Sequence, residues 1–243
     1  MRIGVAQTRP VKGDIRRNIA GHKALIRLAA DYGADAIIFP ELSLTGYQPQ
    51  LAKELAITTD DLSLDEFQAL SEIMNITIGV GVPIRNSRGI NISMLVFRPY
   101  SGVAVYSKKY LHPDEEPFFV PGAAGKPLND DKVAIAICYE LSVPQHLVDA
   151  VSNGAEIYIA SVAKSALGVE SAVPILAGIA NQYNMIVLMS NCVGPCEGFE
   201  AAGRSSVWNR KGVLLRQLND SSEGILIVNT VTEDVTAVEL TQP

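Results

Sequence analysis

The chain has 243 residues, of which 48% are hydrophobic, and a formal net charge of -6 at pH 7. This length and apolar content can bury the core of one α/β domain, so we expect a single domain over residues 1–243. The acidic balance argues against a nucleic-acid partner, which would require a basic face to neutralise phosphates, and favours a small neutral substrate.

The N-terminal half alternates short apolar runs rich in Val and Ile with segments of helical period, as is typical of a layered α/β fold. Strands are predicted over residues 3–7, 36–39, 76–82, 92–98 and 103–107. The last two predict a hairpin around residues 99–102. One predicted helix has Asp14 as its N-cap. Apolar faces are expected on this helix at Ile15, Ile19, Ile26 and Ala29, and on a second helix at Leu64, Phe67, Leu70 and Met74.

The C-terminal half repeats this alternation of strands and helices. Further strands are predicted over residues 132–137, 156–161, 185–190, 213–217 and 225–230. Pro144 suits the first turn of a helix that carries Leu147, Val148 and Val151 and ends at Gly154. Another helix is expected around residues 173–183. Hairpins combined with crossover helices predict a mixed sheet.

Neither a membrane span nor a disulfide framework is expected. The sequence has no apolar run of the roughly 18 residues that a span requires, and its start, MRIGVAQTRP, lacks the long apolar stretch of a signal peptide. We therefore expect a soluble cytoplasmic protein that does not act on membranes. Its three cysteines are an odd number, and no second Cys or His pair completes a zinc-type spacing. Each cysteine is therefore expected to be a free thiol.

Chemically active side chains follow three of the predicted strands. Glu41 comes after an apolar strand and a proline, although a lone glutamate in that position is more often a cap. Lys108 and Lys109 end another strand, and the period of two predicts that at most one of them points inward. Cys138 stands between a strand and a helix. A free cysteine is usually a core residue, but at such a turn it can face backbone N–H groups that stabilise negative charge.

The order of these segments along the chain and their local sequences resemble those of the nitrilase superfamily of carbon-nitrogen hydrolases. The segments that carry the resemblance are residues 40–42 and 45–47, residues 106–108, Cys138-Tyr139-Glu140, Asn191 with Gly194, and Gly203 with Ser205. The resemblance spans nearly the whole chain. It implies a four-layer α-β-β-α sandwich with two mixed β-sheets, a homodimer built by helix packing, and no metal or organic cofactor.

The resemblance also implies the site residues. Glu41, Lys108 and Cys138 correspond to the catalytic residues of the family, whose Y-x-K pattern selects Lys108 over Lys109. Its E-x-x-aromatic-aromatic-x-P-G pattern selects Glu115 over Glu116 as a fourth member.

The chain departs from the family pattern at two places. Ala177 and Ala180 stand where relatives often carry an Arg and a Glu, which predicts that a buried ion pair is missing. Tyr110 replaces a histidine that is often found two residues after the lysine. The roles of His112 and His146 stay open.

These residue types suit amide hydrolysis through a thioester. A thiol of normal pKa needs a base or a nearby cation, and Glu41 and Lys108 supply one each. We expect Glu41 to take the Cys138 proton, and Lys108 with the Tyr139 backbone N–H to bind the oxyanion. Lys164 lies in a glycine-ended loop, residues 161–168, and is expected to meet an anionic substrate tail.

The favoured hypothesis is that the protein is an aliphatic amidase that acts on a small amide-like molecule. An N-carbamoyl hydrolase, a nitrilase and a catalytically silent binding protein of the same fold stay open. A papain-like protease would use a Cys–His pair, but its local signature is absent around Cys138. The glycines of a nucleophile elbow are absent there too. His22 is expected to be a core histidine, and Cys192 and Cys196 are assigned to structure.

Overall fold

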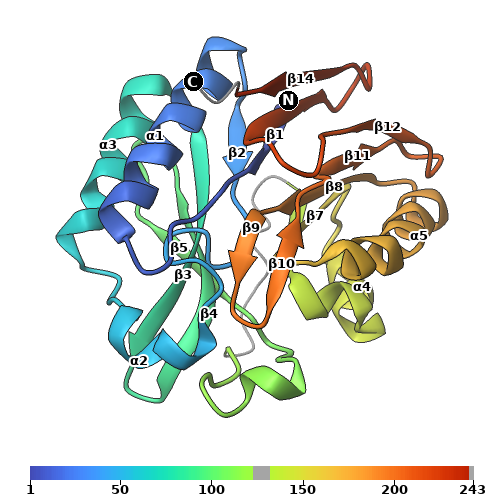
Figure 1. The fold of residues 1–243 in the computed structure, drawn as a ribbon. Helices are drawn as coiled ribbons and strands as arrows, with labels where there is room; N and C mark the ends of the chain where they lie inside the picture. Colours follow the sequence, from blue (N-terminus) through green and yellow to red (C-terminus); the bar gives the residue numbers. More distant parts are fainter. Residues whose placement is uncertain (123–131, 241–243) are drawn as a thin grey trace.

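Two β-sheets pack face to face in the computed structural model of the chain, which describes residues 1–122 and 132–240 (Figure 1). The larger sheet contains, in spatial order, β14 (Val235–Glu239), β13 (Gly224–Asn229), β1 (Arg2–Gln7), β2 (Ala36–Ile38), β3 (Thr77–Asn86), β4 (Gly89–Phe97) and β5 (Ala104–Ser107). The smaller contains β12 (Leu214–Gln217), β11 (Ser206–Trp208), β8 (Ile186–Asn191), β7 (Ile157–Val162) and β6 (Val133–Ile137). Strands β9 (Val193–Cys196) and β10 (Phe199–Ala202) form a separate ribbon.

Both large sheets are mixed, as the resemblance implies. Strands β1, β2 and β3 run parallel to one another, and so do β6, β7 and β8, whereas the other pairs are antiparallel. The predicted β4–β5 hairpin is present. Each parallel pair needs a crossover connection, which the helices supply.

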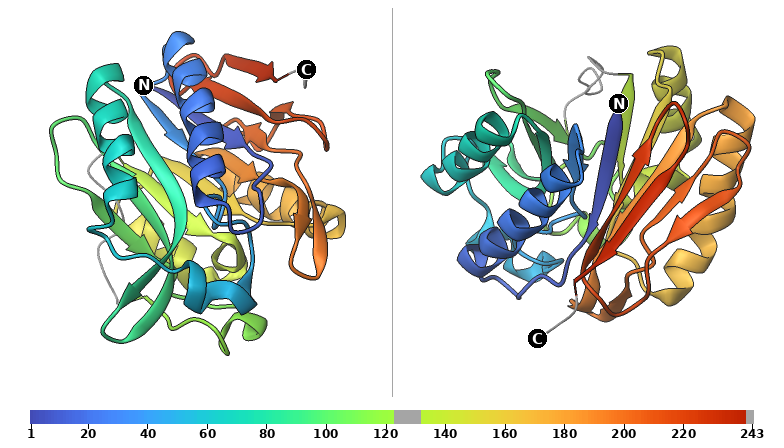
Figure 2. Two further views of the ribbon diagram at one scale, coloured as in Figure 1. Left: turned by 60° about the vertical axis from the view of Figure 1, so that its left-hand side comes forward. Right: turned by 90° about the horizontal axis from the view of Figure 1, so that it is seen from above.

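Helices cover the outer face of each sheet and complete four layers (Figure 2). The helices are α1 (Ile15–Asp31), α2 (Ala52–Leu55), α3 (Asp65–Met74), α4 (Pro144–Ser152) and α5 (Ala166–Tyr183). Helices α1 and α3 lie on the larger sheet, and α4 and α5 lie on the smaller one. The predicted α-β-β-α sandwich is therefore confirmed. No helix within the described ranges is both long and apolar enough to cross a membrane.

Because side chains along each strand point alternately to opposite faces, apolar residues form three layers. One lies between the two sheets, and one lies between each sheet and its helices. In β4, Met94 and Val96 point between the sheets, whereas Leu95 and Phe97 point toward the helices. Full burial of each such side chain contributes about 1.5–3 kcal/mol.

The first helix begins and packs as its sequence predicts. The Asp14 side chain accepts a hydrogen bond from the Arg17 backbone N–H at 3.0 Å, which caps α1. His22 is buried, and its ring nitrogens lie 2.7 Å from the Asn18 carbonyl oxygen and 2.9 Å from Ser43 Oγ. Burial lowers the pKa of His22 to about 4, so this side chain is a neutral core residue.

Several sequence-based boundaries are wrong. Helix α5 begins at Ala166, capped by the Ser165 hydroxyl, and not near residue 173, because Gly168 and the internal Pro174 weaken its helical pattern. Val148 was expected on the apolar face of α4 but is 48% exposed. Strands β9, β10, β11 and β14 were not predicted. The first three have only three or four residues each, too few for a clear period of two.

Strand β3 passes very close to the backbone that follows β2. An added Cβ at Gly81 would lie 2.3 Å from the Pro40 carbonyl oxygen and 2.6 Å from the Leu42 nitrogen. Only glycine fits here without moving the segment that carries Glu41.

We predict that Gly81→Ala lowers the free energy of unfolding by about 1–3 kcal/mol, because the backbone must shift to relieve the overlap. Urea unfolding measures the change. Gly102→Ala is the control, since an added Cβ there meets nothing within 4 Å. Its effect should stay within about 0.5 kcal/mol. Equal stabilities for the two variants would contradict this account of β3.

Candidate active site

The segments after β2, β5 and β6 bring the predicted site residues together at one end of the sandwich. The Lys108 ammonium lies 2.7 Å from Glu41 Oε1 and 2.7 Å from Glu115 Oε1, and all three side chains are almost fully buried. Strands β2 and β5 belong to the larger sheet, whereas β6 and the Cys138 that follows it belong to the smaller one. The group of Glu41, Lys108, Glu115 and Cys138 therefore forms only when the two sheets pack together.

Glu41 is held by a tight turn. The Phe39 N–H donates to the Gly79 carbonyl at 2.9 Å, and the Leu44 N–H donates to the Gly81 carbonyl at 3.0 Å. Between them, Leu42 has a φ of 49°, a left-handed conformation that directs the chain back toward β3. The Oε2 atom of Glu41 is buried and has no hydrogen-bond partner among the described residues. This oxygen is available to accept a proton.

Lys108 points inward and its neighbour does not. Its backbone N–H donates to the Ile92 carbonyl at 2.8 Å, and its own carbonyl accepts from the Gly122 N–H at 2.7 Å. Its side chain is 0% exposed, whereas Lys109 is half-buried, with its ammonium 4.0 Å from Asp149 Oδ2. Alternation thus directs only Lys108 into the group, as the sequence predicted.

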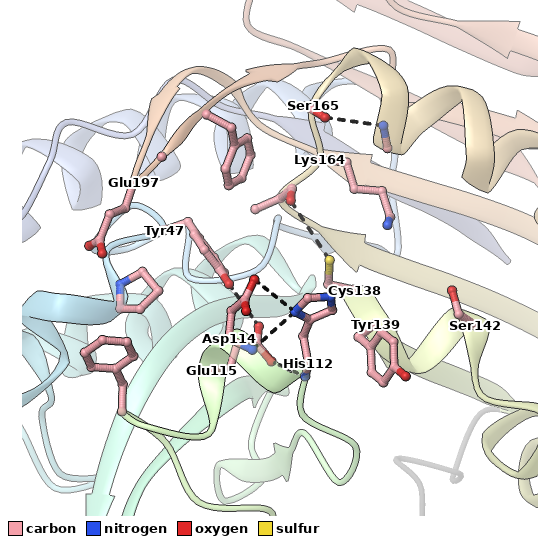
Figure 3. A pocket seen from close by; sticks show the side chains of 16 residues that line it. Tyr47, His112, Asp114, Glu115, Cys138, Tyr139, Ser142, Lys164, Ser165 and Glu197 are labelled. Atoms are coloured by element: carbon pink, nitrogen blue, oxygen red, sulfur yellow. Dashed lines mark hydrogen bonds and ion pairs between the residues drawn. The ribbon is translucent and has the colours of Figure 1, made fainter.

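Cys138 adopts a strained backbone conformation at the end of β6. Its φ is 47°, which is uncommon for a residue with a side chain, and a 3₁₀-helix over Cys138–Ser142 begins there. The sulfur lies 4.0 Å from the Ala163 carbonyl oxygen and faces a pocket (Figure 3). The backbone N–H of Tyr139, in the first turn of that helix, has no carbonyl partner within it.

The ionisation of these side chains is coupled through their burial. Burial raises the pKa of Glu41 to about 7, although Lys108 acts to lower it. Burial and the Glu41 carboxylate raise the pKa of Cys138 to about 11, against the lowering effect of Lys164 and Lys108. Burial acts to lower the pKa of Lys108, but Glu41, Cys138 and Glu115 together raise it. Near neutral pH the site therefore holds a thiol, a charged lysine and a carboxyl group that can exchange a proton.

Glu140 joins the strand that precedes Lys109 to the strand that precedes Cys138. Its Oε1 accepts a hydrogen bond from the Lys109 N–H at 2.7 Å, and its Oε2 accepts from the Ile137 N–H at 2.9 Å and from the Tyr106 hydroxyl at 2.7 Å. Its side chain is 0% exposed. Glu140 thus fixes the backbone next to both Lys108 and Cys138. Glu140 belongs to the Cys138-Tyr139-Glu140 motif, but no role was predicted for it.

The two histidines left open by the sequence occupy different places. His146 is buried behind Glu140, where its ring nitrogens lie 3.1 Å from the Tyr106 hydroxyl and 3.0 Å from the Tyr158 hydroxyl. It is not among the residues that line the pocket, and it packs against the Glu140 cluster. His112 lines the pocket and packs edge-on against Tyr139, with ring centroids 5.3 Å apart.

The pocket in front of Cys138 has a volume of about 640 Å³. Its lining residues are Tyr47, Pro49, His112, Asp114, Glu115, Phe118, Cys138, Tyr139, Ser142, Ala163, Lys164, Ser165, Gly168, Glu197, Gly198 and Phe199. Glu197 and Gly198 form the β9–β10 turn and Phe199 begins β10; this segment was not predicted, because no strand was expected there. The Tyr47 hydroxyl was also missed, and it donates to Glu115 Oε1 at 3.2 Å.

Lys164 lines the pocket on the same side as Cys138 (Figure 3). Its backbone N–H donates to Asn191 Oδ1 at 2.9 Å, and its carbonyl accepts from Asn191 Nδ2 at 3.1 Å. The expected loop over residues 161–168 is shorter than predicted, because β7 runs to Val162 and α5 begins at Ala166. Within residues 1–122 and 132–240, no three His, Cys, Asp or Glu side chains form a group that could hold a metal.

Residues 2–239 match the family model described as carbon-nitrogen hydrolase. The chain is 26% identical over its whole length to a glutamine-dependent NAD(+) synthetase from Thermotoga maritima, but it spans only 44% of that relative's length. It is 28% identical to a protein described as a hydrolase in the agr operon of Staphylococcus aureus, with 97% of this chain and 93% of that one covered.

Solved structures of an amidase from Nesterenkonia sp. AN1 have the same fold. One, at 25% identity, gives a TM-score of 0.84 over 94% of this chain and 92% of that one. Another, described as an amidase from the nitrilase superfamily, is 24% identical and gives a TM-score of 0.85 over 96% and 92%.

We predict that Glu140→Gln destabilises the protein by about 1.5–3 kcal/mol. The amide cannot accept at both ends, so at least one buried hydrogen bond to a charged group is lost. Urea unfolding measures this loss. Glu116→Gln, which changes an exposed carboxylate in the same part of the chain, is the control and should leave stability unchanged. Equal unfolding midpoints for both variants would show that Glu140 does not hold the two strands.

Proposed function

Because the chain belongs to the carbon-nitrogen hydrolase family of the nitrilase superfamily, we propose that it hydrolyses small aliphatic amides to carboxylic acids and ammonia, with Cys138 as nucleophile. The observation that carries the proposal is the buried Lys108 ammonium, 2.7 Å from each of two carboxylates, beside a thiol that faces a pocket. Such a group has a base, a cation and a nucleophile within one water-poor site.

In the first half-reaction, Glu41 takes the proton of Cys138 as the sulfur attacks the amide carbon. The thiol is neutral at rest because burial and Glu41 raise its pKa to about 11, so proton transfer must accompany attack. Lys108 and the Tyr139 N–H stabilise the oxyanion of the tetrahedral intermediate. Glu41 then protonates the nitrogen of the tetrahedral intermediate, the carbon–nitrogen bond breaks, ammonia leaves, and a thioester remains on Cys138.

In the second half-reaction, Glu41 deprotonates a water that attacks the thioester and releases the acid. Glu115 positions the Lys108 ammonium and takes no proton itself. It holds Lys108 through Oε1 and accepts the His112 backbone N–H through Oε2 at 2.8 Å, so the ammonium stays between the two carboxylates.

The structures of the Nesterenkonia amidase support amides as the substrate class. One structure of the Nesterenkonia amidase contains butyramide, and another shows the acetamide moiety of fluoroacetamide added at its active-site cysteine. A pocket of about 640 Å³ holds such molecules with space to spare. The Lys164 side chain, for which no carboxylate partner is found in the described residues, is proposed to bind a longer anionic tail. N-carbamoyl compounds and nitriles are the alternatives.

A substrate panel tests the proposal. Short-chain amides, amides with a carboxylate tail, N-carbamoyl amino acids and nitriles are incubated with the protein, and ammonia is measured. We expect the highest kcat/KM with amides, and a fall of at least about three orders of magnitude in Cys138→Ala. Wild-type and Cys138→Ala proteins that release ammonia equally would rule out this nucleophile.

The two adjacent lysines provide a matched pair of variants. Lys108→Met should lose about two to three orders of magnitude in kcat, as expected for removal of an oxyanion donor. Lys109→Met should retain activity, since that ammonium lies outside the group. Circular dichroism checks that both variants fold, because Lys108→Met leaves two buried carboxylates without their cation. Equal activities would contradict the role of Lys108.

The pH dependence of kcat/KM tests Glu41 as the base. The base must be ionised, and burial raises its pKa to about 7, so activity should fall as the pH decreases through about 7 and not near 4.5. Because the Glu115 charge raises this pKa, Glu115→Gln should move the acidic limb to lower pH. Asp114→Asn, at an exposed neighbour, should not. A limb that does not respond to Glu115→Gln would contradict the assignment.

A further inference from the structure

A pair of thiols lies directly behind the pocket wall and takes no part in the proposed chemistry. The Cys192 and Cys196 sulfur atoms are 3.9 Å apart. Cys192 is 2% exposed and follows β8, whereas Cys196 is half-buried at the end of β9. Gly194, with a φ of 90°, lies between them. The sulfur atoms of a disulfide are about 2.05 Å apart, so a shift of about 2 Å would join the two.

We propose that Cys192 and Cys196 are a site of reversible oxidation, which a hydroperoxide converts to a disulfide. Cys196 attacks one peroxide oxygen, so that an S–O bond forms, the O–O bond breaks and the alcohol or water leaves. Cys192 then attacks the Cys196 sulfur, an S–S bond forms, and the oxygen leaves as water with the Cys192 proton. Two thiols are oxidised and one peroxide is reduced.

The surroundings favour Cys196 as the attacking thiol. It is the more exposed of the two, and a hydrogen bond with the Cys192 thiol lowers its pKa. Cys192 is the anchored partner, because its carbonyl accepts the Gly203 N–H at 2.8 Å. Closing the pair therefore moves the Cys196 side, which carries the β9–β10 turn.

That turn is connected to the site. The Glu197 N–H, next to Cys196, donates to the Tyr47 carbonyl at 3.0 Å, and the Phe199 and Tyr47 rings pack with centroids 5.7 Å apart. The Tyr47 hydroxyl donates to Glu115, which holds Lys108. The thiols also pack against Ala163, Tyr47 and Phe199, all of which line the pocket. Oxidation of the pair should thus alter access to Cys138.

The chemistry is tested in Cys138→Ala, whose only remaining cysteines are this pair. After treatment with tert-butyl hydroperoxide, intact mass should fall by the mass of the two thiol hydrogens. Peptide mapping should find a Cys192–Cys196 link that dithiothreitol removes. Cys138→Ala/Cys196→Ser is the control and should form no link. Oxidation of Cys196 to sulfinic acid without a link would overturn the proposal. This readout needs no substrate, so it is independent of the proposed amidase activity.

The coupling to the pocket is tested by labelling Cys138 with iodoacetamide in the otherwise unchanged protein. Disulfide formation should change the labelling rate by at least about twofold, because a change of this size is expected when one hydrogen bond in the pocket wall is altered. Peroxide should not change the rate in Cys196→Ser, or in Cys192→Ala if the serine variant is unstable. An unchanged rate in the disulfide form would show that the pair does not influence the pocket.

Discussion

The structure depends on the placement of one buried ammonium group between two carboxylates. Removing Lys108 from water is costly, and the short contacts to Glu41 and Glu115 offset that cost. Because the three side chains come from segments on one sheet and Cys138 comes from the other, the packed sandwich is a precondition for the group. A folded protein without Lys108 would keep two carboxylates in its core with no cation between them.

A third buried carboxylate sets the geometry without joining the chemistry. Glu140 accepts backbone N–H groups on both sides of the gap between the sheets, next to Lys108 and next to Cys138. The strained φ of Cys138 is held in place by this anchor. Burial, which raises the pKa values of both Glu41 and Cys138, keeps the thiol protonated until a substrate arrives. In the proposed mechanism, the same enclosure protects the nucleophile and prepares its base.

Local sequence signals predicted most of the strands and helices, and the family resemblance implied their arrangement in a sandwich, but the site was predicted only in part. The Asp14 cap and the strand before Cys138 follow from periods and capping rules that act over a few residues, whereas the choice of Lys108 over Lys109 came from the family's Y-x-K pattern. The β9–β10 turn, with Glu197 and Phe199, was missed because its strands are too short to show a period. The bridging role of Glu140 depends on the approach of two sheets, which a local pattern does not contain.

The central claim is that Glu41 activates Cys138 to form an acyl thioester. The most direct measurement is the intact mass of the protein, acid-quenched during the first turnover of a short-chain amide and followed by peptide mapping. The account predicts an acyl adduct on Cys138 in the wild type, and formation slower by at least about two orders of magnitude in Glu41→Gln. Acylation of Glu41→Gln at the wild-type rate, or an adduct on a residue other than Cys138, would contradict it.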